Sequence, residues 1–369
     1  MSPQGASDAL HARVRALVLA FERGEPMPEP FDALAVDLVR FQAAHVPGYQ
    51  RLCEAHGIAA GSITRAEQAA AVPTDAFRLG NVFAFDVQDA SATFRTSGTT
   101  GGPRGTHRMR VLGTYDAAAL AFGRSMLAWD LAPPVVVLVI GPSFEDAPDS
   151  SLAYMCALFA RALGGNRPPE QVFFVRGGQL QLDAFRRTVR ELGAQTPVLV
   201  LATSLALMVL LEALGDETFA LPMRSRVMQT GGLKRKTGEL SPDGLRQAIV
   251  RAFALSERDV VGEYGMTELS SQFWEATLVE PSSRHGVYVE PPWARVIPVD
   301  PETLVPVPPG EAGIARIEDL ANVDSAFAVL TQDRVRRVRG GFELLGRSAE
   351  APPRGCSIGL AEMLSMERA

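Results

Sequence analysis

Hydroxyl-bearing residues and glycines are concentrated in residues 96–105, where the sequence reads TSGTTGGPRG. Backbone N–H groups and hydroxyls at this density can surround phosphate oxygens, and a guanidinium adds charged donors. The alternative is an ordinary surface loop. The segment fits neither the Walker A pattern nor the dinucleotide-binding fingerprint, so it predicts a phosphate cradle of another type. The residues of this cradle are Thr96, Ser97, Gly98, Thr99, Thr100, Gly101, Gly102, Arg104 and Gly105.

A second polar group ends a short apolar run at residues 262–268, which read GEYGMTE. The planar ring of Tyr264 suits a base, the hydroxyl of Thr267 suits a phosphate oxygen, and the carboxylate of Glu268 suits Mg²⁺. Taken alone, the segment could be a strand end with a polar turn. Its position after the first segment favours a nucleotide site.

A third segment, QTGGLKRK at residues 229–236, contains the only two lysines of the chain, Lys234 and Lys236. Gly231 and Gly232 have no side chains, so a flat base could approach their backbone. Lys234 could reach a phosphate or a substrate carboxylate. The alternative is a solvated basic turn, and the near absence of lysine elsewhere leaves both interpretations open.

The first two segments resemble the signatures T-S-G-T-T-G-x-P-K-G and Y-G-x-T-E of the adenylate-forming superfamily, which includes acyl-CoA synthetases, peptide-synthetase adenylation domains and luciferases. The resemblance implies that Glu263, Tyr264 and Gly265 bind the nucleotide, with Tyr264 against adenine. It also implies that Thr267 contacts the α-phosphate of ATP and that Glu268 holds Mg²⁺. The glycines of residues 229–236 resemble the strand end that lies along the adenine in this superfamily.

Two later segments extend the resemblance. The stretch LTQD at residues 330–333 is similar to the family's T-G-D, and GFELLGR at residues 341–347 is similar to its stretch ending in G-R. These similarities imply that Asp333 and Arg347 bind the ribose. Arg104 stands where the family has a lysine, and Gln332 stands where it has a glycine.

The family pattern breaks after Arg347, because members of the superfamily continue with a small domain that carries a catalytic lysine. This chain has 22 further residues and no lysine there. We therefore expect only the large domain, at residues 1–347, followed by a tail at residues 348–369.

Length and tail resemble the acyl-protein synthetases of bacterial luminescence, and also a truncated adenylating protein of phenazine antibiotic biosynthesis. The first resemblance implies that Cys356 accepts the acyl group. The alternative is that Cys356 is a buried structural cysteine.

Composition narrows the class of protein. The chain has 369 residues, 47% hydrophobic, and its 36 basic against 42 acidic residues give a net charge of −6. That balance argues against dedicated nucleic-acid binding. We see no signal peptide and no apolar run of the roughly 20 residues that cross a bilayer. Three widely spaced cysteines without a CxxC pair fit a reducing cytoplasm.

The periodicity of apolar residues predicts an α/β protein. We expect a helical cap at residues 1–90, an α/β core at 91–270 and a β-rich subdomain at 271–347. Helices are predicted at residues 9–23, 32–46, 112–129, 183–192, 204–214 and 241–254. Strands are predicted at residues 135–140, 172–175, 198–202, 227–230 and 260–264.

These expectations together describe an enzyme that activates a carboxylic acid with ATP and Mg²⁺ as an acyl adenylate. The acyl group would pass to a thiol or to a partner reductase. The acid could be an aromatic acid such as a phenazine carboxylate or a fatty acid, and the candidate pocket residues Phe144, Tyr154, Phe273 and Trp274 suit both. The alternative function is a nucleotide-binding accessory protein that has lost catalysis.

Overall fold

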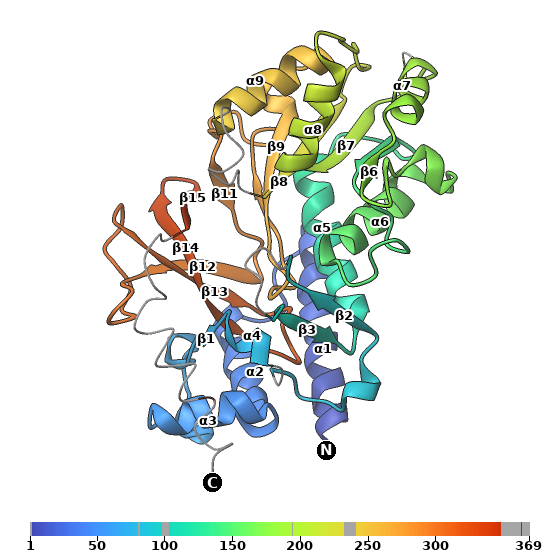
Figure 1. The fold of residues 1–369 in the computed structure, drawn as a ribbon. Coiled ribbons are helices and arrows are strands. Elements are labelled where there is room, and N and C mark those ends of the chain that lie inside the picture. Colours follow the sequence, from blue (N-terminus) through green and yellow to red (C-terminus); the bar gives the residue numbers. More distant parts are fainter. Residues whose placement is uncertain are drawn as a thin grey trace. The chain divides into compact units, whose positions relative to one another are not determined.

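The computed structural model describes residues 2–79, 82–97, 103–193, 195–231, 241–347 and 363. The chain divides into two compact units, each held together by contacts among its own residues (Figure 1). The first unit comprises Met1–Phe122, Met266–Gln272 and Val289–Ala369. The second unit comprises Gly123–Gly265 and Phe273–Tyr288.

The first unit begins with three helices, α1 (Pro3–Glu22), α2 (Phe31–His45) and α3 (Pro47–Ala55). Helix α1 starts six residues earlier than predicted, because the Ser2 hydroxyl caps it by accepting from the Gly5 N–H at 3.1 Å and a proline occupies its first position. Helix α2 buries Leu34, Leu38 and Phe41, as its apolar spacing predicts.

The strands of the first unit form an antiparallel sheet in the order β12-β13-β14-β15, and β1 pairs with β14 in parallel. A separate hairpin of β2 and β3 flanks the hydroxyl-rich segment. The bounds are β1 (Val72–Pro73), β2 (Ala92–Arg95), β3 (Thr106–Met109), β12 (Ala294–Val299), β13 (Ala312–Asp319), β14 (Ala328–Val338) and β15 (Gly341–Arg347). The short helix α4 (Ala76–Leu79) and helix α5 (Leu112–Leu127) lie between them in sequence.

The second unit is built on the parallel strands β4, β7, β8 and β9, with β10 antiparallel to β9. Strands β4 and β7 are nearly continuous apolar runs, because both of their faces are covered. Helices α7, α8 and α9 pack a core of Phe185, Leu207, Leu210, Ile249 and Phe253 onto one face (Figure 1). The bounds are β4 (Val136–Ile140), β5 (Val175–Arg176), β6 (Gln179–Leu180), β7 (Val198–Thr203), β8 (Arg226–Thr230), β9 (Val260–Tyr264), β10 (Phe273–Glu275), β11 (Val287–Val289), α6 (Ser151–Gly164), α7 (Leu182–Arg190), α8 (Ser204–Leu214) and α9 (Pro242–Phe253).

Most predicted elements are confirmed to within a few residues, and the exception is the strand predicted at residues 172–175. A 3₁₀ turn at Pro169–Gln171 precedes it, Phe173 makes an isolated parallel bridge with Val139 of β4, and Val175 enters the hairpin β5–β6. The Val172 carbonyl and the Phe174 N–H bond to Val139, so the predicted strand is reduced to a single bridge beside β4. Among the described residues, no helix has the length and apolar character needed to cross a membrane.

The approach of β12 to β13 generates a prediction about Gly313. A Cβ atom there would lie 2.5 Å from the Val299 carbonyl oxygen and 2.7 Å from the Val299 nitrogen, so backbone would have to move. We expect Gly313→Ala to lower the free energy of unfolding by about 1–3 kcal/mol, measured by denaturant titration.

Gly113→Ala is the matched control. Gly113 lies in α5, and nothing is within 4 Å of the added Cβ. Alanine is the better helix former by up to ~1 kcal/mol, so this variant should be as stable as the wild type or more stable. Equal unfolding midpoints for the two variants would contradict the close approach at Val299.

Candidate functional site

The carboxyl of Glu268 lies in the short segment Met266–Gln272 of the first unit and is 8% exposed. Burial raises its pKa to about 7, and the charge of Asp333 acts in the same direction, whereas Arg347 and Arg78 oppose the shift. At neutral pH this carboxyl is therefore divided between its protonated and ionised forms.

The ends of the hydroxyl-rich segment lie beside Glu268. The Thr96 N–H donates to the Gly105 carbonyl, and the Gly105 N–H donates to the Thr96 hydroxyl, both at 2.9 Å. A Cβ on Gly105 would be 3.0 Å from Thr96 Cγ2 and 3.6 Å from Glu268 Oε1, so glycine permits this close approach. Ser97 is exposed. Gly98, Thr99, Thr100, Gly101 and Gly102 lie outside the described residues.

Arg104 folds back onto the strand that precedes the segment. Its Nε donates to the Thr96 carbonyl at 2.5 Å and its Nη2 to the Arg95 carbonyl at 3.2 Å. The guanidinium thus ties the two ends of the segment together.

Asp333 and Arg347 are brought together by the pairing of β14 with β15, in which they are direct partners. Arg347 Nε donates to Asp333 Oδ1 at 3.1 Å, and the Asp333 N–H donates to the Thr331 hydroxyl at 3.0 Å. Because both side chains also act on the pKa of Glu268, the first unit gathers Thr96, Gly105, Glu268 and this pair at one place.

The other predicted nucleotide residues lie in the second unit. Gly231 follows β8 with φ 78°, a conformation that favours glycine, and its carbonyl accepts from the Ser204 hydroxyl at 2.5 Å. Glu263 is buried, which raises its pKa to about 7, and it accepts a hydrogen bond from the Thr230 hydroxyl. The Tyr264 ring contacts Phe273 and Tyr288, and Gly265 follows it. Gly232 and Lys234 lie outside the described residues.

Sequence reasoning missed a cavity of about 300 Å³ in the second unit. The carboxyl ends of β4 and β7, the first turns of α6 and α8, and the hairpin β5–β6 line it without a charged side chain. The signal was the small residues Gly141, Ala153, Ala202 and Ala206 beside the apolar strand ends.

The four aromatic residues predicted for the pocket do not line this cavity. Phe144 stacks edge-on against Tyr154 at 5.1 Å. Phe273 and Trp274 are fully buried, and they pack against Tyr264 and Phe159 respectively. Phe273 and Trp274 therefore fill core space.

The two described cysteines are buried and unpaired by disulfide. Burial raises the pKa of the Cys53 thiol to about 11 and that of Cys156 to about 12. Neither is a thiolate at neutral pH, so neither suits nucleophilic attack. Cys356 lies outside the described residues.

His107, two residues after the hydroxyl-rich segment, is a buried strand residue and not a solvated loop residue. It lies in β3, is 2% exposed, and places Nδ1 2.8 Å from the Thr267 carbonyl oxygen. Burial lowers its pKa to about 4, although the hydrogen bond to Thr267 acts in the opposite direction. His107 is therefore neutral at physiological pH.

No group of three or more His, Cys, Asp or Glu side chains within the described ranges could hold a metal ion. A nucleotide-bound Mg²⁺ does not need such a cage, because it keeps several waters and takes one or two carboxylates together with phosphate oxygens. The hard, partly ionised carboxylate of Glu268 beside the hydroxyl-rich segment fits that requirement.

Comparisons with known proteins place this geometry in context. The family model described as acyl-protein synthetase, LuxE, matches residues 7–365. The long-chain-fatty-acid–luciferin-component ligase of Vibrio harveyi is 21% identical over 327 residues, which cover 85% of this chain and 82% of the ligase.

Two solved structures match this chain. A 2-hydroxyisobutyryl-CoA ligase, in complex with 2-HIB-AMP and CoA in the thioesterification state, is 16% identical with a TM-score of 0.62, covering 86% of this chain and 68% of the ligase. This likeness confirms the predicted α/β class. ATP-bound MatB from Rhodopseudomonas palustris is 14% identical with a TM-score of 0.48, covering 72% of this chain, which spans about half (49%) of that protein.

The raised pKa of Glu268 predicts a pH-dependent stability. The folded chain binds this proton more tightly than the unfolded chain, so the associated stability is fully present below about pH 4.5 and is lost as the pH rises through 7. The loss is on the order of 3 kcal/mol. Glu268→Gln cannot ionise, so its unfolding free energy should fall less than that of the wild type between pH 5 and pH 8.

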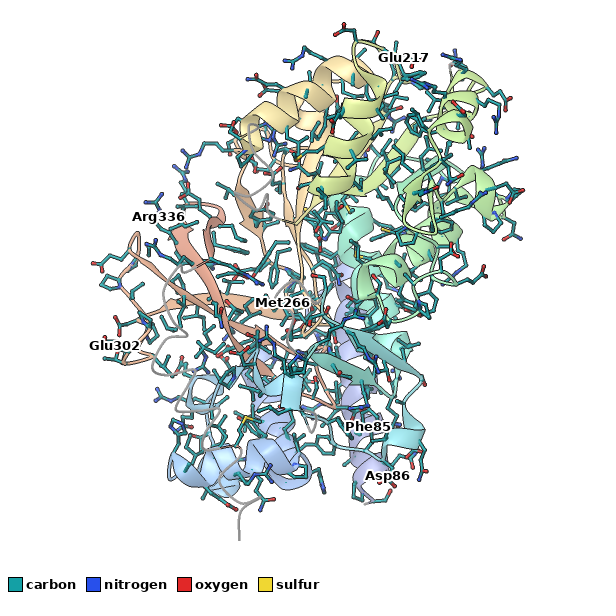
Figure 2. The ribbon with its side chains drawn as sticks, viewed as in Figure 1. Phe85, Asp86, Glu217, Met266, Glu302 and Arg336 are labelled. Carbon is teal, nitrogen blue, oxygen red and sulfur yellow. The ribbon has the colours of Figure 1, made fainter. Side chains whose placement is uncertain are left out.

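Denaturant titrations across this pH range provide the measurement. Glu302→Gln, in the exposed turn after β12 (Figure 2), controls for the loss of one carboxyl. Glu263→Gln should remove a second, similar contribution from the other unit. Parallel pH curves for the wild type and Glu268→Gln would contradict the raised pKa.

Proposed function

Because the chain belongs to the acyl-protein synthetase family, we propose that it activates a carboxylic acid with ATP and transfers the acyl group to a thiol. The observation that carries the proposal is the gathering of Glu268, Asp333 and Arg347 beside the ends of the hydroxyl-rich segment. A protein that only binds a nucleotide has no need for a buried carboxyl suited to a metal ion, which argues against the accessory alternative.

The first step joins a substrate carboxylate oxygen to the α-phosphorus of ATP and breaks the bond to the β-phosphate. The products are an acyl adenylate and pyrophosphate. Mg²⁺, when bound to Glu268, would neutralise charge that develops on the phosphate oxygens. The Thr267 hydroxyl would donate to an α-phosphate oxygen, and Asp333 and Arg347 would bind the ribose.

Two basic side chains are candidates for neutralising the negative charge of the phosphates during the reaction. Arg104 would hold the departing pyrophosphate in addition to closing the hydroxyl-rich segment. Lys234 would take the role of the lysine that longer relatives carry in their small domain.

The acyl group would occupy the cavity of the second unit. Its lining without charged side chains suits an apolar body, and a volume of about 300 Å³ is at the lower end for a ligand pocket. Such a lining accepts either an alkyl chain or a planar ring. The name of the Vibrio harveyi relative supports a fatty acid over a phenazine carboxylate.

The second step would be attack of the Cys356 thiolate on the acyl carbonyl, which forms a thioester and releases AMP. Cys53 and Cys156 are buried with raised pKa values, so they do not compete. Cys356 follows Arg347 by nine residues, a reach of at most about 31 Å. Seven residues later, the Met363 carbonyl accepts from Arg51 Nε at 2.6 Å. A reductase would then consume the thioester in the cytoplasm.

The adenylation step is tested by carboxylate-dependent exchange of labelled pyrophosphate into ATP. We expect exchange with acids of one class in a panel from long-chain fatty acids to benzoic and phenazine carboxylates. Glu268→Gln should slow exchange by about 100-fold or more, because a few kcal/mol of transition-state stabilisation is lost. ATP binding without exchange for every acid would favour the accessory alternative.

The transfer step is tested with Cys356→Ser. We expect this variant to retain pyrophosphate exchange and to lose the protein-bound acyl label that hydroxylamine releases. Cys53→Ala is the control, since Cys53 is buried in α3, and it should keep the label. Labelled Cys356→Ser protein would exclude Cys356 as the acceptor.

A further inference from the structure

The segment Met266–Gln272 contains neither helix nor strand, so other groups must satisfy the backbone carbonyls of Thr267 and Glu268. Two buried side chains from distant parts of the first unit do this. His107 Nδ1 lies 2.8 Å from the Thr267 oxygen, and Asn322 Nδ2 donates to the Glu268 oxygen at 3.0 Å.

The orientation of the His107 ring is fixed on three sides. Because a carbonyl only accepts, Nδ1 must carry the proton, and Nε2 then accepts from the Ser325 hydroxyl at 3.0 Å. The ring also stands edge-on to Phe77, with centroids 5.6 Å apart. Its hydrogen bond to Thr267 therefore has one direction and one tautomer.

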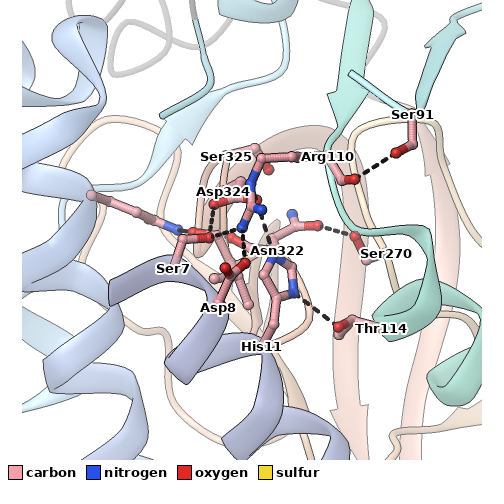
Figure 3. Close-up of polar contacts among 12 residues, drawn as sticks. Ser7, Asp8, His11, Ser91, Arg110, Thr114, Ser270, Asn322, Asp324 and Ser325 are labelled. Atoms are coloured by element: carbon pink, nitrogen blue, oxygen red, sulfur yellow. Dashed lines mark hydrogen bonds and ion pairs between the residues drawn. The ribbon is translucent and has the colours of Figure 1, made fainter. Parts of the chain in front are cut away.

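The Asn322 amide has all its principal hydrogen bonds made. Nδ2 donates to the Glu268 and Ala326 carbonyls, both at 3.0 Å. Oδ1 accepts from the Ser270 hydroxyl at 2.7 Å (Figure 3). Gln42 of α2 braces the same loop by donating to the Asn322 carbonyl at 2.8 Å. The backbone of Asn322 is thus bonded to α2, while its side chain is bonded to the turn that contains Glu268.

These contacts fix two successive peptide planes, on either side of the Glu268 Cα, and the direction of the Glu268 side chain depends on them. We propose that His107 and Asn322 are positioning residues, which hold Thr267 and Glu268 in the geometry that adenylation requires. This inference rests on the proposed function. Misplacing a reacting group by about 1 Å can cost 10²-fold in rate, so the effect should be large.

A neighbouring histidine provides the matched control. His11 lies in the same buried part of the first unit, where Nε2 contacts Asp324 Oδ2 at 2.9 Å and Nδ1 contacts the Thr114 hydroxyl at 2.8 Å (Figure 3). Its partners lie on α5 and in the loop after β13, and not in the turn that holds Thr267 and Glu268. Its loss should cost stability without displacing Thr267 or Glu268.

The experiment compares His107→Leu, His107→Asn, Asn322→Leu and His11→Leu in pyrophosphate exchange, at a temperature where each is folded. Leucine removes the donors, whereas the Asn amide nitrogen can take the place of Nδ1. We expect His107→Leu and Asn322→Leu to lower kcat at least tenfold, with KM for ATP changed less than threefold. His107→Asn should recover to within threefold of the wild type, and His11→Leu should keep the wild-type kcat.

Three results would overturn the inference: wild-type kcat in His107→Leu, no recovery in His107→Asn, or an equal loss in His11→Leu. Failure of the proposed function would look different, because the wild type itself would then show no exchange. That result would remove the premise and this inference with it. Amide hydrogen exchange gives a second readout: residues 267–271 should lose protection in His107→Leu and keep it in His107→Asn.

Discussion

The first unit depends on a buried carboxylate that binds backbone. Asp319, at the end of β13, accepts from the N–H groups of Ser270, Ser271 and Ala321 and from the Ser271 hydroxyl, at 2.7–3.0 Å. Burial raises the pKa of Asp319 while these hydrogen bonds act against the shift. Burying a carboxyl costs free energy unless its oxygens accept hydrogen bonds. The loop after β13 and the segment Met266–Gln272 are therefore held together by Asp319. These hydrogen bonds hold the backbone of Ser270 and Ser271, which follow Glu268 by two and three residues.

Burial also affects the carboxyl of Glu268 in the candidate site. Burial raises the pKa of Glu268 to about 7, so this carboxyl can be neutral when no cation is bound. A bound divalent cation would favour the ionised form of Glu268 and reverse the cost of its burial. Burial makes the carboxyl of Glu268 costly to ionise, and a bound metal nucleotide would offset that cost.

The sequence alone predicted the elements whose bounds follow from local apolar spacing. Helix α8 and strand β9 have the expected bounds, and Asp333 and Arg347 are strand partners. It could not predict His107 or Asn322, whose partners are 160 and 54 residues away, because no local pattern encodes a contact of that length. The cavity escaped for the same reason: β4, β7, α6 and α8 each look like ordinary core when considered separately.

The division between the units falls inside the GEYGMTE motif, between Gly265 and Met266. Each half has its own anchor. In the second unit the buried Glu275 accepts from the Gly262 N–H at 2.8 Å and pairs with Arg246 at 2.9 Å, which fixes strand β9 as it leads to Tyr264. In the first unit the anchors are His107 and Asn322. A strand needs only a neighbour to hold its backbone, whereas a turn outside regular structure needs side chains that reach its carbonyls. Thr267 and Glu268, which the motif makes easy to recognise, therefore depend on buried polar residues that no motif marks. His107 and Asn322 hold the backbone of the turn and are as much a part of the site as the Glu268 carboxyl.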